Sequence, residues 1–183
     1  GDISMGRILS IISVALFISS FSWAHEEHKL TRIAGSHSID LKEYDHSVAG
    51  QVRDFTVFGD ISEATNSSEL SMKRDGVLVR AKFELKGSIW GGRVQHQHDG
   101  RLVTTEIFFK GLKKETNQLI FSVNGVEALV SIVSASFVNN HFINPEYTIV
   151  YKGEEFKYNI ESGQACYKYS ALLSFVMLGA LLH

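Results

Sequence analysis

Two similar stretches of sequence decide the fold of this chain: DGVLVRAKFELKG at residues 75–87 and DGRLVTTEIFFKG at residues 99–111. Each stretch opens with Asp-Gly and closes with Lys-Gly. Alternate residues of the first stretch are apolar, namely Val77, Val79, Ala81, Phe83 and Leu85. This period of two indicates a half-buried strand, and an Asp-Gly pair tolerates the positive φ angles of a type I′ turn. Each stretch is therefore predicted to be the return arm of a β-hairpin.

The same pattern extends over the rest of the chain. Asn124-Gly125 and Lys152-Gly153 predict two further hairpin turns, and about nine or ten strands are expected in all. No segment shows the period of an amphipathic helix. The sequence therefore predicts an all-β fold, with an immunoglobulin-like antiparallel β-sandwich as the first interpretation and an up-and-down β-barrel as the alternative.

Composition and charge indicate one globular domain, expected at residues 25–163. The chain is 44% hydrophobic and 21% charged, which suits a folded domain. Within it, residues 25–35 are interpreted as a loose polar arm and residues 60–69 as a polar loop. The formal net charge is −2 and long basic runs are missing, so no nucleic-acid partner is expected. The single cysteine, Cys166, excludes an intrachain disulfide.

Residues 5–24 have the pattern of a secretory signal peptide. A positive start at Met5-Gly6-Arg7 is followed by an apolar run at residues 8–18, and Ser22 and Ala24 suit the −3 and −1 positions of a cleavage site. The protein is therefore predicted to enter the secretory pathway, with His25 as its mature N-terminus.

The apolar C-terminal tail, residues 164–183, has three interpretations. It is a lipid-anchor (GPI) signal with attachment at Gly163, because small residues and a short spacer precede the apolar run at residues 171–182. Alternatively it is a short membrane anchor, although it is shorter than the length of about 20 residues that a spanning helix needs. The third interpretation is a terminal strand or helix buried in the domain. The first two tether the protein to a membrane through the tail.

Candidate sites are few, and catalytic motifs are missing from the sequence, so a non-enzymatic protein is expected. Asn66-Ser67-Ser68 is an N-glycosylation acceptor in the predicted loop. His96 and His98 are two residues apart on a predicted strand, beside Asp99, and their imidazoles could bind a divalent metal. If His25 begins the mature chain, its amine and imidazole could bind copper, with His28, His96 or His98 as a further ligand.

Three stretches together resemble one known family: TTEIFFKG at residues 104–111, LIFSVNG at residues 119–125 and EALVSIVSASF at residues 127–137. They are similar to the luminal domain of the alpha subunit of the translocon-associated protein complex. The resemblance implies an immunoglobulin-like luminal domain, a place in the endoplasmic reticulum membrane, and a non-enzymatic role at the protein-translocation channel.

Three functions follow as expectations. The first is a membrane-tethered luminal or extracellular binding or accessory protein with a protein partner, for example a component of translocation in the endoplasmic reticulum. The second is a GPI-anchored interaction protein at the cell surface. The third is a copper-binding protein that uses His25.

Overall fold

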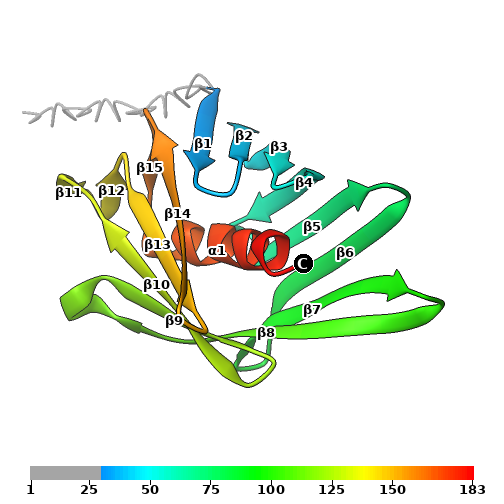
Figure 1. Cartoon of the computed structure of the whole chain (residues 1–183). Helices are drawn as coiled ribbons and strands as arrows, with labels where there is room; N and C mark the ends of the chain where they lie inside the picture. Colours follow the sequence, from blue (N-terminus) through cyan, green and yellow to red (C-terminus); the bar gives the residue numbers. More distant parts are fainter. Residues whose placement is uncertain (1–29) are drawn as a thin grey trace, which may run out of the picture.

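Twelve antiparallel strands form a closed β-barrel in the computed structural model of the protein, which describes residues 30–183 (Figure 1). Going around the barrel, the strands follow one another in chain order from β2 to β10, then come β13, β14 and β1. A separate small sheet has the order β11-β12-β15. The all-β prediction is confirmed. The barrel alternative describes the structure, and the immunoglobulin-like sandwich does not.

The strands are more numerous than the sequence pattern predicted. They are β1 (Thr31–Gly35), β2 (Ile39–Tyr44), β3 (Ser47–Val52), β4 (Phe55–Ser62), β5 (Ser67–Arg74), β6 (Val77–Lys86), β7 (Ile89–His98), β8 (Arg101–Lys113), β9 (Gln118–Val123), β10 (Val126–Val133), β11 (Ser136–Val138), β12 (His141–Ile143), β13 (Glu146–Tyr151), β14 (Glu154–Glu161) and β15 (Gln164–Ala165). A short 3-10 helix, η1 (Lys114–Thr116), joins β8 to β9.

The predicted hairpin turns are confirmed. Asp75-Gly76, Asp99-Gly100, Asn124-Gly125 and Lys152-Gly153 each join two paired strands, and both residues of each pair have positive φ. For Asp75 and Gly76 the φ angles are 43° and 80°. Two residues with positive φ make a type I′ turn, whose twist matches that of the strands it joins. The two stretches that resemble each other are thus β6 and β8, the return arms of β5 and β7.

Of the two Lys-Gly pairs, Lys86-Gly87 ends its strand but Lys110-Gly111 does not. β6 ends at Lys86, before Gly87, but β8 continues past Lys110 and Gly111 to Lys113. The pairing of β8 with β9 shifts register between Phe109 and Gly111, which marks a β-bulge. A bulge bends its strand and increases the local twist, which helps a sheet to close.

The first strand closes the barrel. β1 pairs with β14 on one side and with β2 on the other, with Ile33 opposite both Ile160 and Leu41. The interpretation of residues 25–35 as a loose arm is therefore wrong for Thr31–Gly35. This strand is only five residues long, and its apolar residues, Ile33 and Ala34, do not alternate, so the sequence gives little sign of it.

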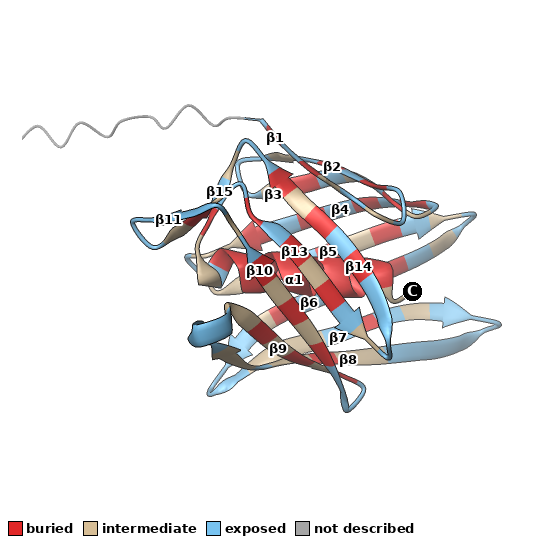
Figure 2. Ribbon diagram, turned by 60° about the vertical axis from the view of Figure 1, so that its left-hand side comes forward, coloured by how far each residue is buried: buried red, intermediate tan, exposed pale blue. Residues whose placement is uncertain are grey.

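One helix, α1 (Tyr167–Leu181), lies inside the barrel (Figures 1 and 2). Every residue from 169 to 181 is buried, and the inward side chains of the surrounding strands complete the core. The ring of Phe175 stacks on that of Phe83 at 4.7 Å between centroids, and it meets the edges of Phe121 and Trp90 at 5.0 and 5.8 Å. The C-terminal tail is thus a buried helix, the third of the three sequence interpretations.

Gly163 links the barrel to this helix. Its N–H donates to Asn144 Oδ1 at 3.0 Å, and its carbonyl accepts from the Asn144 N–H at 2.8 Å. Lipid attachment at Gly163 would remove the helix that fills the barrel, so the fold favours the buried-helix interpretation over the anchor signal. Among residues 30–183, no helix combines the length and the apolar character needed to cross a membrane.

The two serines of the buried helix are paired with tyrosines. Ser170 Oγ lies 2.8 Å from Tyr147 Oη, and Ser174 Oγ lies 3.3 Å from Tyr158 Oη. Ser174 also donates to the Ser170 carbonyl at 2.6 Å. The two tyrosine rings stack on each other with centroids 4.8 Å apart. Buried hydroxyls cost little only when they are hydrogen-bonded, so these pairs favour one rotation of the helix within the barrel.

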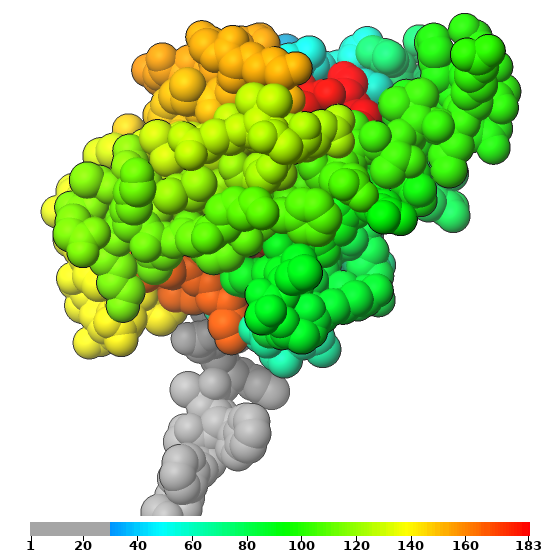
Figure 3. Space-filling view, turned by 90° about the horizontal axis from the view of Figure 1, so that it is seen from below, coloured from blue at the N-terminus to red at the C-terminus, as the bar shows by residue number. Residues whose placement is uncertain are grey.

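Polar contacts also hold the beginning of the helix. Cys166 is its N-cap: the Tyr169 N–H donates to Cys166 Sγ at 3.3 Å, and the thiol donates to Glu63 Oε1 at 3.0 Å. The Tyr169 hydroxyl donates to the carboxylate of Glu43 on β2. The small sheet lies beside this end, where Phe142 packs edge-on against Tyr167 at 5.0 Å. From below, the start and the end of the helix are seen at opposite sides of the molecule (Figure 3).

Replacing Glu43 with Gln tests this contact through the pH dependence of stability. Burial raises the pKa of Glu43 above its ordinary value of 4.5, although the hydrogen bond from Tyr169 acts in the opposite direction. The folded state therefore holds the Glu43 proton at a pH where the unfolded chain has released it. We therefore compare the free energy of unfolding of the wild type with that of Glu43→Gln. The first minus the second should fall as the pH rises from the ordinary pKa of a glutamate to the raised pKa of Glu43 in the folded state.

The measurement is urea unfolding of both proteins from pH 4 to pH 8. All other titrating groups are common to the two proteins, so they largely cancel in the difference. A difference that stays constant, or that increases with pH, would contradict the assignment of a half-buried carboxyl with a raised pKa at this position.

Candidate functional site

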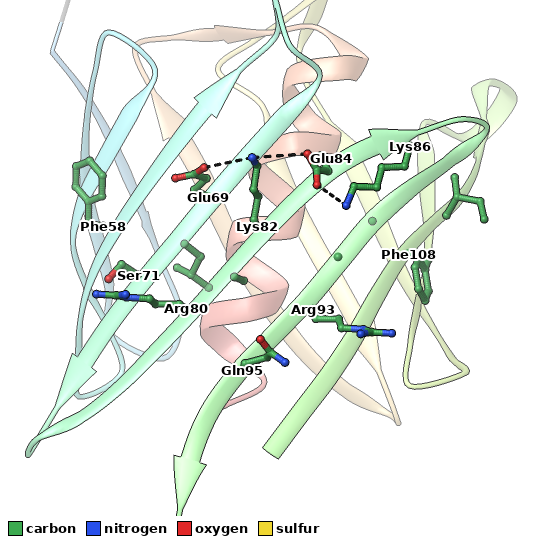
Figure 4. A pocket seen from close by; sticks show the side chains of 15 residues that line it. Phe58, Glu69, Ser71, Arg80, Lys82, Glu84, Lys86, Arg93, Gln95 and Phe108 are labelled. Atoms are coloured by element: carbon green, nitrogen blue, oxygen red, sulfur yellow. Dashed lines mark ion pairs between the residues drawn. The ribbon is translucent and has the colours of Figure 1, made fainter. Parts of the chain in front are cut away.

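A shallow trough with a volume of about 860 Å³ lies on the outer face of β4–β8. The side chains labelled in Figure 4 lie on the outside of the barrel, and the buried Leu70 and Ala81 also line the trough. Phe58 and Phe108 stand near its two ends, and between them lie Arg80, Lys82 and Arg93. The trough is therefore an amphiphilic surface, with cationic groups between two aromatic rings.

The strand register places these side chains in rows. In the first row, Phe58 is opposite Ser71, Ser71 opposite Arg80, and Arg80 opposite Gln95. In the second, Glu69 is opposite Lys82, Lys82 opposite Arg93, and Arg93 opposite Glu106. Side chains directly opposite one another on one face of a sheet are near neighbours. The alternation that buries the apolar residues of β6 thus sends its charged residues to the trough.

Two consecutive glycines shape the bottom of the trough. A Cβ on Gly91 would lie 2.4 Å from both the Phe108 ring and the Ile107 carbonyl oxygen, so the ring of Phe108 rests where a side chain would stand. A Cβ on Gly92 would lie 1.9 Å from the Lys82 carbonyl oxygen on the neighbouring strand. Glycine in a strand allows close approach of another backbone or side chain. Here it brings Phe108 down against β7.

Most of the charges in the trough are paired. Glu84 accepts from Lys86 at 2.9 Å and lies 3.6 Å from Lys82, and these lysines, Lys86 first, lower the pKa of its carboxyl. Arg93 pairs with Glu106 at 3.0 Å. Within residues 30–183, Arg80 has no ion pair. Four cationic side chains line the trough against two acidic ones, whereas the whole chain has a net charge of −2.

Two of the histidines predicted as metal ligands, His96 and His98, both lie on β7, two residues apart as the sequence analysis expected. His98 lies at the tip of the β7–β8 hairpin, with Nε2 3.4 Å from Asp99 Oδ2. His96 is two residues further into the strand. Its ring lies nearly perpendicular to that of His183, with centroids 5.5 Å apart. Among residues 30–183, His, Cys, Asp and Glu do not gather in groups of three that could hold a metal ion. His25 and His28, predicted for copper binding, lie outside the described residues.

Asn66 lies in a tight turn rather than in a long polar loop. The prediction of a loop at residues 60–69 is wrong at both ends, because β4 continues to Ser62 and β5 begins at Ser67. Asn66 is half-buried with a φ of 50°, and Ser68 of the same motif is buried in the barrel wall. Glycosylation of Asn66 stays a prediction.

No protein-family model, curated protein or solved structure matches the chain. The three stretches that resemble the translocon-associated alpha subunit lie on β8, β9 and β10, with the last continuing into β11. They are consecutive strands of the barrel wall, so the immunoglobulin-like fold that the resemblance implies is not the fold observed. The trough, rather than any sequence motif, is thus the basis for an inference about function.

Replacing Gly91 with Ala tests the packing at the bottom of the trough. The added methyl group would meet the Ile107 carbonyl and the Phe108 ring, and overpacking of this kind costs about 1–3 kcal/mol. The expected result is a loss of that size in the free energy of unfolding, measured by denaturant titration.

Gly111→Ala is the matched control. A Cβ on Gly111 would meet no other atom within 4 Å, and the glycine does not have positive φ. This substitution should leave stability unchanged or raise it by up to about 1 kcal/mol, because alanine restricts the unfolded chain. Equal effects of the two substitutions would show that Phe108 does not rest on β7 as described.

Proposed function

We propose that this protein is a non-enzymatic binding protein that acts on the luminal or extracellular side of a membrane system, and that the trough on β4–β8 holds an acidic segment of a partner protein. The observation that carries the proposal is Arg80, which has no ion pair among the described residues and lies in a trough with a cationic excess and an aromatic ring near each end. Aromatic and arginine side chains are enriched in protein interfaces, where they provide most of the binding energy.

The dimensions of the trough suit an extended polypeptide. Five strands at a spacing of about 4.8 Å span roughly 19 Å, which is the length of about six residues of extended chain. Phe58, which is 52% exposed, and Phe108 would contact apolar side chains at the two ends of such a segment. Arg80 would bind a carboxylate between them, since its guanidinium can form two parallel hydrogen bonds with one carboxylate.

The cellular location in this proposal comes from the predicted signal peptide, which lies outside the described residues. A role at the translocation channel and a role at the cell surface are both consistent with a secretory protein. Co-purification with channel subunits would support the first, and labelling of intact cells with a membrane-impermeant reagent would support the second. Neither role requires the C-terminal tail as an anchor, because α1 is part of the core.

A peptide array tests the binding surface. The probe is a set of eight-residue peptides with Asp or Glu at the central positions and Leu or Phe near both ends, beside a matched set in which Asn and Gln replace the acids. We expect the protein to prefer the acidic set, and the preference should weaken as salt screens the charges.

Arg80→Ala should weaken binding to the best acidic peptide by about tenfold or more, because a hydrogen bond to a charged group is worth about 1.5–3 kcal/mol. Arg101→Ala is the matched control, since Arg101 is an exposed arginine at the start of β8, outside the trough. Equal binding of the acidic and amide sets, or equal losses in the two variants, would contradict the proposal.

A further inference from the structure

The end of the barrel where α1 finishes brings together two histidines from distant parts of the chain. His96 comes from β7, and His183 follows the last turn of α1. Their ring centroids are 5.5 Å apart and their planes are nearly perpendicular, at 88°. The two meet only because the helix lies in the barrel, so the pairing cannot be read from sequence spacing.

The separation of the rings is that of two imidazoles on one metal ion. A zinc–nitrogen bond is about 2.0–2.1 Å long, and the ring centroid lies roughly 1.2 Å beyond the nitrogen. Two imidazoles on a tetrahedral ion therefore have centroids roughly 5.3 Å apart. The observed separation of the centroids, 5.5 Å, is close to this value.

The hydrogen bonding of each ring leaves a nitrogen for a metal. His183 Nδ1 lies 2.8 Å from the Gly179 carbonyl oxygen, which can only accept, so Nδ1 carries the proton and Nε2 keeps its lone pair. Metal-binding histidines commonly donate their second N–H to such a carbonyl. His96 Nδ1 is buried and has no hydrogen-bond partner within residues 30–183.

The surroundings give the site both supporting and opposing charges. The carbonyl groups at the end of α1 favour a cation. Arg53 and Lys152 line the neighbouring cavity of about 340 Å³ and oppose a cation, while Glu154 in the same cavity offsets one of them. Water from this cavity can fill the remaining coordination positions.

From this geometry we propose that His96 and His183 form an open binding site for a divalent transition-metal ion of the zinc or copper class. Imidazole suits these ions, and two protein ligands leave positions for water or for a ligand of another molecule. The site differs from the predicted pair of His96 and His98, because the second ligand is His183, which follows the helix. It is independent of the trough and of the function proposed for it.

The test is thermal unfolding of the full chain with and without zinc chloride. An ion that binds only the folded state raises the unfolding temperature, and at concentrations well above the dissociation constant the increase should be at least about 3 °C. Because the two histidines meet only in the folded barrel, a flexible site elsewhere in the chain, which persists on unfolding, would give no comparable increase.

His183→Ala and His96→Ala should each abolish the zinc-dependent increase, measured against the same variant without zinc. His98→Ala is the matched control on the same strand and should keep the increase. A folding defect in His96→Ala would not decide the test, because His183→Ala provides a second variant. His183 lies beyond the helix, so its replacement leaves the barrel wall intact. The proposal is overturned if zinc produces no shift in the wild type, or if the shift persists in His183→Ala.

Discussion

The burial of one apolar helix inside the barrel is the constraint on which the rest of the structure depends. The interior of a barrel widens as the number of strands grows, and one of about eight strands is just filled by its own side chains. A barrel of twelve strands therefore needs additional material in its interior, and α1 supplies it with residues buried from 169 to 181. Ser170 and Ser174, paired with tyrosines of the wall, favour one rotation of this helix.

Because the helix fills the interior of the barrel, ligands can bind only on the outer surface and at the ends of the barrel. The trough lies on the outside of β4–β8, and its cationic side chains are those that alternate with the core residues of the same strands. At the end of the helix, His183 meets His96 because the helix fixes where the chain finishes. Both candidate sites thus follow from the same packing, although they differ in chemistry.

The hairpin turns were predictable from the sequence, the buried helix was one of three interpretations of the tail, and the two candidate sites were not predictable. Asp75-Gly76 and Asn124-Gly125 predicted their turns because few residues tolerate positive φ at two successive positions. α1 is apolar on all sides, so it shows no amphipathic period and resembles a membrane segment. The trough depends on strand register, which places Arg80 beside Ser71 and Gln95, residues that are distant in sequence from one another. The pairing of His96 with His183 depends on tertiary structure alone.

The central claim is that the C-terminal tail is the core of the barrel, and cooperative unfolding of a chain that ends at Gly163 tests it most directly. Thermal unfolding would be followed by near-ultraviolet circular dichroism, which reports the fixed packing of the aromatic side chains. The account predicts that the shortened chain shows neither an ordered aromatic signal nor a cooperative transition, because Phe83, Phe121 and Trp90 lose Phe175 as their partner. A shortened chain that unfolds cooperatively at the same temperature as the full chain would contradict the account.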